Sequence, residues 1–170
     1  MSAPFRLEPL GPSHERSGFS CGVEALDQYF ALRASQDVRR RVSACYVAVE
    51  DGSGRVAGFY TLAASSVPLS DLAPDSRKRL PRYPAVPVAR IGRLAIAKAF
   101  QGKGLGGALL ADAALRATRS ELGVFALIVD AKDEEAAAFY RHHGFEPLGG
   151  NDRQLLVSLE RFTRTVASKR

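Results

Sequence analysis

The sequence has 170 residues, enough for one domain with a sizeable core, and 46% hydrophobic and 25% charged residues are ordinary for a globular α/β protein. No apolar run approaches membrane-spanning length and the N-terminus has no long apolar signal core, so we expect a single cytoplasmic domain over residues 1–170 with no membrane partner. Two cysteines, Cys21 and Cys45, are too few for a disulfide framework or a zinc cluster, and we expect no metal. The net charge of +6 and the pI near 9.7 favour a polyanionic partner.

Hydrophobic periodicity and turn residues predict alternating strands and helices. In chain order we expect a strand at 5–10, a helix at 22–40, a hairpin of strands at 43–50 and 55–67, an irregular segment at 68–88, a strand at 89–96, a helix from the following glycine loop to 122, a strand at 124–131, a helix at 133–145 and a strand at 153–162. Strands dominate the first half, and strands alternate with helices in the second. This order predicts an α/β (α+β) fold, a mixed central sheet of about six to seven strands with helices on its faces.

The glycine loop after the strand at 89–96 allows three interpretations. A Walker A loop is excluded because Lys103 precedes Gly104, which offers no hydroxyl for magnesium. A dinucleotide fingerprint matches at Gly102, Gly104 and Gly107, with Asp130 as the ribose-binding acid. Against it, four residues separate the strand from the first glycine, and only about 40 residues follow Asp130, too few for that fold.

The third interpretation, a pyrophosphate nest, explains the pattern Q-x-x-G-x-G at residues 101–106 best. Glycines let successive backbone N–H groups converge on one anion without interference from a Cβ. The helix that begins near Gly104 adds its positive N-terminal end, and Lys103 adds a charge at the rim.

A second motif follows at residues 133–145. Asp133 is suited to cap a helix whose first turn carries two glutamates. The alanines of Ala136–Ala138 leave room for a ligand beside the helix, Tyr140 follows, and Gly144 is typical of a helix C-cap.

The pair Q-x-x-G-x-G and A-x-x-F-Y-x-x-x-G-F, separated by a helix and a strand, strongly resembles the GNAT superfamily of acyl-CoA-dependent N-acyltransferases over about residues 43–160. The resemblance implies that the nest binds the pyrophosphate of acetyl-CoA, that the strand before it pairs with the pantetheine arm, and that the helix at 133–143 flanks the thioester. Asp133 stands where the family often has asparagine. The expected cofactor-binding residues are Leu94, Ala95, Ile96, Gln101, Gly102, Lys103, Gly104, Leu105, Gly106, Gly107, Asp133, Ala136 and Phe139.

Tyr140 is the candidate catalytic acid. A phenol with a pKa of about 10 is protonated at neutral pH and can supply a proton to a departing thiolate, whose thiol has a pKa of about 8.5. The alternative is a helix tyrosine that only packs against the sheet. The resemblance also implies that a backbone N–H of the Leu94–Ile96 strand polarises the thioester oxygen.

The strand Arg93–Ile96 lacks the glutamate base that lysine-directed members of the family often place there. An α-amine has a pKa of about 7.7–8.0, lower again beside an ester, and therefore needs less help than lysine at about 10.4. This favours an α-amino substrate such as an aminoacyl ester, although a base elsewhere in the fold stays open.

Basic residues occur in two runs before the candidate active strand, Arg90 and Arg93 border that strand, and no acidic residue lies between Arg77 and Arg93. With few interleaved aromatic residues, these runs suit contact with a phosphate backbone more than base stacking. The candidate tRNA-contacting residues are Arg39, Arg40, Arg77, Lys78, Arg79, Arg82, Arg90 and Arg93.

The segments at 17–29, 36–41, 60–63, 80–88 and 92–96 narrow the resemblance to the GNAT toxins of bacterial type II toxin–antitoxin operons. The resemblance implies acetylation of the α-amino group of aminoacyl-tRNA and a ribbon-helix-helix antitoxin as partner, and it allows a homodimer. Two other classes stay open: a GNAT enzyme for a small amine or a protein N-terminus, and a catalytically silent binding protein.

Overall fold

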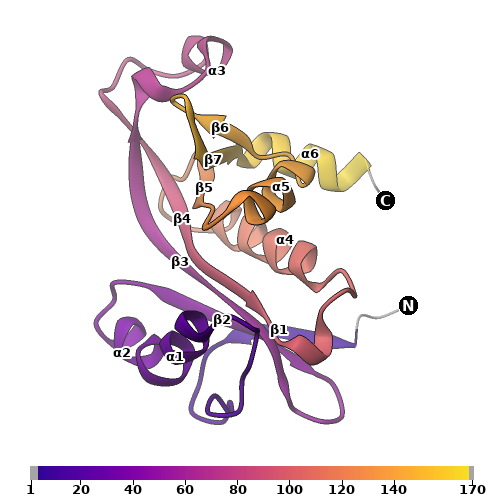
Figure 1. Ribbon diagram of the computed structural model, residues 1–170. Helices are drawn as coiled ribbons and strands as arrows, with labels where there is room; N and C mark the ends of the chain where they lie inside the picture. Colours follow the sequence, from indigo (N-terminus) through magenta and orange to yellow (C-terminus); the bar gives the residue numbers. More distant parts are fainter. Residues whose placement is uncertain (1–3, 169–170) are drawn as a thin grey trace. The chain divides into compact units, whose positions relative to one another are not determined.

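The computed structural model describes residues 4–168, and the chain separates into two compact units (Figure 1). The first unit takes in the chain up to Ala63 together with Gly92–Asp112, and the second takes in Ala64–Ile91 and the chain from Ala113 onward. The elements, in order, are β1 (Phe5–Pro9), α1 (Glu24–Leu32), α2 (Ala34–Arg39), β2 (Ala44–Glu50), β3 (Val56–Pro68), η1 (Leu69–Asp71), α3 (Pro74–Lys78), β4 (Ala85–Ile96), η2 (Lys98–Phe100), α4 (Leu105–Thr118), β5 (Ala126–Asp130), α5 (Glu134–His142), β6 (Glu146–Leu148), β7 (Asn151–Ser158) and α6 (Leu159–Ser168).

Across residues 4–168 the strands form a seven-stranded sheet in the order β1-β2-β3-β4-β5-β7-β6. The pairs β1/β2, β2/β3, β5/β7 and β6/β7 are antiparallel, and β4/β5 is parallel. The expected mixed sheet with flanking helices is confirmed. In the same part of the chain, no helix combines the length and the apolar character needed to cross a bilayer.

In the first unit, the two faces of β3 carry different partners. Phe59 stacks on Phe30 of α1 with ring centroids 4.4 Å apart, and the ring of Phe19 meets Phe59 edge-on at 5.5 Å. The next side chain, Tyr60, points the other way and donates a hydrogen bond of 2.6 Å to Asp112 of α4. The alternation of side chains along β3 thus places α1 on one face and the middle of α4 on the other.

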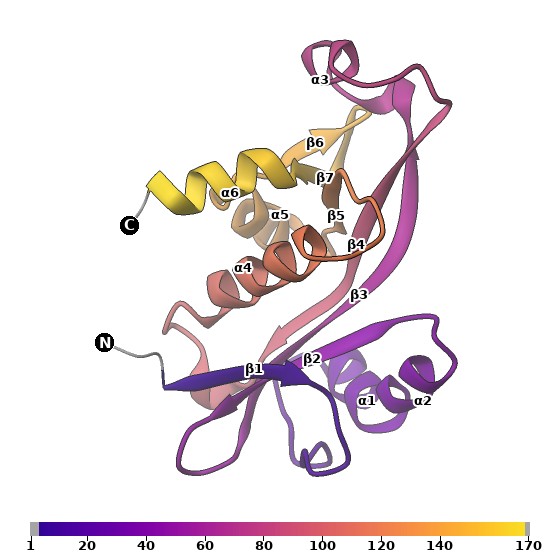
Figure 2. The same cartoon turned by 180° about the vertical axis from the view of Figure 1, so that it is seen from behind.

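The predicted helix at 22–40 is two helices, because the backbone leaves helical geometry at Arg33 (φ −121°, ψ −27°). Figure 2 shows α1 and α2 next to one another. The break lets the Tyr29 hydroxyl donate a 2.8 Å hydrogen bond to Asp37 of α2. Tyr29, Phe30 and Ala34 are all buried at this turn, so burial of side chains decides the break and periodicity alone did not reveal it.

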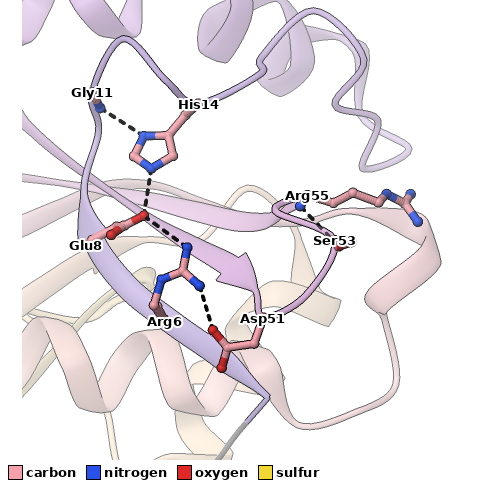
Figure 3. Close-up of polar contacts among 7 residues, drawn as sticks. All are labelled: Arg6, Glu8, Gly11, His14, Asp51, Ser53 and Arg55. Atoms are coloured by element: carbon pink, nitrogen blue, oxygen red, sulfur yellow. Dashed lines mark hydrogen bonds and ion pairs between the residues drawn. The ribbon is translucent and has the colours of Figure 1, made fainter.

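A chain of polar contacts holds β1 and the loop after it in the first unit (Figure 3). Arg6 forms an ion pair of 2.6 Å with Asp51, and Glu8 lies 2.8 Å from Nε2 of the buried His14. The Gly11 N–H donates to Nδ1 of His14 at 2.9 Å, so the neutral ring carries its proton on Nε2 and donates it to Glu8. Exposed pairs such as Arg6–Asp51 contribute about 0–1 kcal/mol, so their main effect is to fix geometry.

The second unit has its own core cluster, which joins the ends of β3 and β4 to β5 and β6. Its buried residues are Val67, Leu72, Val86, Val88, Ala126, Ile128 and Leu148. Helices α5 and α6 both pack against β7, as Figures 1 and 2 show.

Several predicted boundaries in the second unit are wrong. Strand β4 begins at Ala85, four residues before the predicted start at residue 89. Pro87 has no N–H to donate, but its carbonyl oxygen still accepts the Phe125 N–H at 2.9 Å, so the proline is tolerated in the strand. The predicted strand at 153–162 ends at Ser158, whose hydroxyl oxygen accepts the Arg161 N–H at 3.1 Å and starts α6. Helix α4 ends at Thr118, well before Gly123, and β6 was not predicted.

At Gly58, the backbone of β3 lies very close to that of β4, and this close packing can be tested. A Cβ there would lie 2.9 Å from the backbone oxygen of Ala95 and 3.0 Å from Cδ1 of Ile96. We expect Gly58→Ala to lower the free energy of unfolding by about 1–3 kcal/mol through overpacking, measured by urea denaturation. Gly123→Ala is the matched control, since a Cβ there meets nothing within 4 Å. Equal stability of the two variants would contradict the contact.

Candidate active site

The loop between β4 and α4, in the first unit, has the backbone of an anion-binding nest. Gly102 (φ +79°) and Gly104 (φ +80°) are left-handed, a conformation that glycine adopts without strain. A Cβ at either would meet nothing within 4 Å, so the dihedral angle and not the available space calls for glycine. Left-handed residues alternating with others turn successive N–H groups toward one point, and the first N–H groups of α4 have no partner within the helix. The loop therefore fits a pyrophosphate.

Gln101 holds this loop in place. Its Nε2 donates to the backbone oxygen of Ile96 at 2.9 Å and to that of Cys21 at 3.0 Å. The amide nitrogen of Gln101 is thus engaged in two hydrogen bonds to the backbone, and the N–H groups of the loop are left to bind an anion. Lys103 follows with its ammonium 5.6 Å from the centroid of the Phe100 ring. Its role as a positive charge at the rim of the nest stays a prediction.

The predicted pantetheine strand forms the end of β4. Ala95 is buried, and Leu94 and Ile96 are half-buried. The strand is tied to β3 by the Ala97 N–H, which donates to Ala57 at 2.8 Å. One residue before the predicted segment, the Arg93 N–H donates to the side-chain oxygen of Thr61 at 3.0 Å.

In the second unit, α5 has the predicted caps. Asp133 is extended (φ −157°, ψ 179°), and its Oδ1 accepts the Ala136 N–H at 2.8 Å. At the other end, Gly144 has φ +95°, and the Phe145 N–H donates to the backbone carbonyl oxygen of Tyr140 at 3.1 Å. One Asp133 oxygen is engaged in the cap, as an N-cap requires, so its predicted contact with a cofactor stays a prediction.

Tyr140 lies on the buried face of α5 with 9% of its surface exposed. Its ring meets Phe139 at 5.2 Å and Phe145 at 5.5 Å, both edge-on, while Phe139 is half-buried. Within residues 4–168 the hydroxyl makes no hydrogen bond. Burial raises the pKa of Tyr140 to about 12, so the phenol keeps its proton at physiological pH.

Most of the predicted tRNA-contacting residues are exposed, but two have partners that change their electrostatics. The exposed ones are Arg39 and Arg40 at the end of α2, Arg77 and Lys78 in α3, and Arg79, Arg82 and Arg93. Arg90 forms an ion pair with Asp130, whose other oxygen accepts from Gln154 at 3.3 Å, so the charge of Arg90 is largely compensated. This pairing also engages Asp130, the acid that the dinucleotide interpretation needed. Arg93 lies over the ring of Tyr29.

Sequence reasoning missed Tyr29, Asp37 and Thr61, which together fix Arg93. Thr61 is 1% exposed, and a polar residue inside the apolar run of β3 was a usable signal. No sequence signal pointed to Tyr29 and Asp37, because their contact depends on the break at Arg33. Over residues 4–168, His, Cys, Asp and Glu form no group of three placed to hold a metal ion.

A mixed sheet with a glycine nest between a strand and a helix defines the class of acyl-CoA-dependent N-acyltransferases. The acetyltransferase (GNAT) domain matches residues 41–147, and the chain belongs to this family. The matched segment includes parts of both units.

Proteins that are similar to this chain in sequence and in structure agree with the family assignment. The chain is 39% identical over 147 residues to a tRNA-acetylating toxin of Mycobacterium tuberculosis, covering 85% of this chain and 84% of that protein. It is similar to the structure of AtaT complexed with acetyl-methionyl-tRNAfMet (TM-score 0.84, 28% identity, 97% and 98% of the two chains). It is also similar to a tyrosine-to-phenylalanine mutant of the toxin AtaT bound to acetyl-CoA and the C-terminus of the antitoxin AtaR (TM-score 0.78, 25% identity, 96% and 99%).

The nest makes a direct prediction. Gly104→Val forces a β-branched residue into a left-handed conformation, which distorts the N–H groups of the loop. We expect acetyl-CoA binding to fall below detection in calorimetry while the circular dichroism spectrum stays that of the wild type. Gly123→Val, at a position without such a dihedral angle, should bind normally. A folded Gly104→Val variant of unchanged affinity would show that the pyrophosphate lies elsewhere.

Proposed function

We propose that this protein is a toxin that uses acetyl-CoA to acetylate the α-amino group of aminoacyl-tRNA, blocks translation in the cytoplasm, and is neutralised by a ribbon-helix-helix antitoxin. The observation that carries the proposal is the 39% identity, over 85% of the chain, to a tRNA-acetylating toxin. The AtaT complexes with an acetylated tRNA and with an antitoxin segment support the substrate and the partner. We further propose that residues 1–170 act as one catalytic domain, and a homodimer is compatible with this.

We propose that the N–H groups of Gly102–Gly107 hold the pyrophosphate of acetyl-CoA. The left-handed glycines and the N-terminal end of α4 support this assignment. The backbone of Leu94, Ala95 and Ile96 would pair with the pantetheine arm. Asp133, Ala136 and Phe139 would line the thioester end, where small and half-buried side chains leave room.

Acetyl-CoA supplies an acetyl group activated as a thioester. In the transfer, the amine nitrogen bonds to the carbonyl carbon, the carbon–sulfur bond breaks, and one proton passes in effect from nitrogen to sulfur. We propose that the Tyr140 hydroxyl delivers the proton to sulfur and that a backbone N–H of the Leu94–Ile96 strand polarises the carbonyl oxygen.

The high pKa of Tyr140 refines this role. A phenol with a pKa of about 12 is a weaker acid than a thiol at about 8.5, so full ionisation of Tyr140 is unfavourable. Tyr140 therefore acts first as a hydrogen-bond donor to the sulfur as charge develops, and the proton lost by the amine replaces the one it gives up. The same high pKa keeps every molecule of enzyme in the donating form.

The substrate class follows from two observations. No carboxylate lies on the strand segment Arg93–Ile96, which suits an α-amine that is largely neutral already. The exposed cations of α2, of α3 and of the loop after α3 suit a polyphosphate.

Tyr140→Phe keeps the ring and removes only the donor. We expect kcat to fall by about a hundredfold to ten-thousandfold with acetyl-CoA affinity nearly unchanged. Phe145→Leu, whose native ring meets that of Tyr140 edge-on at 5.5 Å, is the control for altered packing. Turnover of Tyr140→Phe within a few-fold of the wild type would assign Tyr140 to packing alone.

The pH profile is a second test of Tyr140. The rate should rise with pH as the α-amine, with a pKa of about 7.7–8.0 or lower beside an ester, loses its proton. It should then stay level to about pH 10, because burial raises the pKa of Tyr140 to about 12 and the donating form persists throughout that window. A fall of the rate with an apparent pKa of about 10 would contradict a buried, protonated donor.

Charge reversal tests whether the basic residues of α3 and Arg79 contact the phosphates of the tRNA. We expect Arg77→Glu, Lys78→Glu and Arg79→Glu together to weaken tRNA binding and to reduce the magnitude of the log–log salt slope by about 2–3, about 0.9 for each lost phosphate contact. Acetyl-CoA binding should be unchanged. Efficient acetylation of a free small amine, with every charged tRNA left untouched, would replace the toxin by a small-amine acetyltransferase.

A further inference from the structure

Arg93 is an exposed cation on a rigid support. Its guanidinium carbon lies 3.6 Å from the centroid of the Tyr29 ring, a face-on contact in the first unit. Stacking of this kind takes up the face of the guanidinium and leaves the in-plane N–H groups able to donate. Within residues 4–168, Arg93 forms no ion pair with a carboxylate. Arg93 is therefore left without a direct ion-pair partner among these residues, in contrast to Arg90.

The ring under Arg93 is itself fixed. Tyr29 is 5% exposed, its ring stacks on Phe59 with centroids 6.4 Å apart, and its hydroxyl donates to Asp37 at 2.8 Å. Burial and the hydrogen bond to Asp37 raise the pKa of Tyr29 to about 12, so this donor keeps its proton. Asp37 accepts this hydrogen bond and so orients the ring, and it forms no direct ion pair with Arg93 in the described residues.

The backbone of Arg93 is fixed as well. Its N–H donates to Thr61, a buried side chain of β3, at 3.0 Å. Arg93 directly precedes the Leu94–Ile96 segment, which is proposed above to pair with the pantetheine arm and to polarise the thioester carbonyl. The Arg93 side chain therefore starts next to the proposed site of acetyl transfer.

We propose that Arg93, held by Tyr29 and Asp37, binds the phosphodiester next to the aminoacylated 3′ nucleotide of the tRNA and so places the α-amine for transfer. The proposal rests on the toxin function proposed above. A planar guanidinium with free in-plane donors matches two phosphate oxygens, and a preset orientation reduces the entropy lost on binding. Tyr29 and Asp37 are positioning residues that act through Arg93.

Arg93→Gln tests the contact, because the exposed side chain can be changed without disturbing the core. We expect kcat/KM for aminoacyl-tRNA to fall about tenfold to a hundredfold, mainly through KM, as for the loss of one charge-assisted contact. The magnitude of the salt slope of tRNA binding should fall by about 0.7–0.9. Arg33→Gln, which removes an exposed charge of the same unit that the structure places on no ring, is the control and should change neither value appreciably.

The support is tested at Tyr29. Tyr29→Phe retains the stacking ring but loses the hydrogen bond to Asp37, so kcat/KM should fall by about threefold to tenfold. Tyr29→Leu also removes the ring and should lower kcat/KM further, in the direction of Arg93→Gln. Unchanged acetyl-CoA affinity shows that each variant is folded. If Tyr29→Leu does not fold, Arg93→Lys takes its place: a lysine lacks the planar fork and should recover only part of the loss.

The outcomes separate the two proposals. A wild type that acetylates no aminoacyl-tRNA overturns the toxin function and this inference with it. A wild type active on aminoacyl-tRNA, with Arg93→Gln keeping its rate and its salt slope, overturns the inference alone. An equal loss in Arg33→Gln would show a general charge effect and would also overturn it.

Discussion

The glycine turn between β4 and α4 is the constraint on which the candidate site depends. Two left-handed residues, Gly102 and Gly104, turn the chain between η2 and the start of α4. Gln101 ties that turn to Ile96 and Cys21 through two hydrogen bonds from one amide nitrogen. Because the Gln101 side chain fixes the loop through these bonds, the backbone N–H groups of the loop are held in place for an anion without reorganisation, the condition for strong electrostatic binding.

The basic residues differ in what surrounds them, and this matters more than their number. Arg90 is compensated by Asp130, and its charge serves the second unit itself. Arg93 is stacked on a buried tyrosine and forms no ion pair in the described part of the chain. The net charge of +6 counts both residues equally, although only Arg93 is exposed and outside an ion pair in the described residues. The hydroxyls of two tyrosines differ in the same way: that of Tyr29 has a hydrogen-bond partner, whereas that of Tyr140 has none in the described residues and keeps its proton because burial raises its pKa.

Motifs with a local physical cause were predictable. The helix caps at Asp133 and Gly144 follow from side-chain acceptors and left-handed glycine, and both are present. Boundaries at which two patterns compete were not predictable. The apolar pattern continues through residues 153–162, but the strand ends at Ser158, whose hydroxyl oxygen accepts the Arg161 N–H at the start of α6. The prolines near 84–87 suggested irregular structure, yet Pro87 still offers its carbonyl to Phe125.

The sequence by itself determined the mixed fold, the family and the two motifs, because these rest on backbone preferences of residues adjacent in the chain. Only the tertiary structure decided which charges are available. The pairing of Arg90 with Asp130, and the stacking of Arg93 on a ring oriented by Asp37, join residues far apart in sequence. Such contacts depend on strand register and on a helix break at Arg33, and neither leaves a periodic signal in the chain.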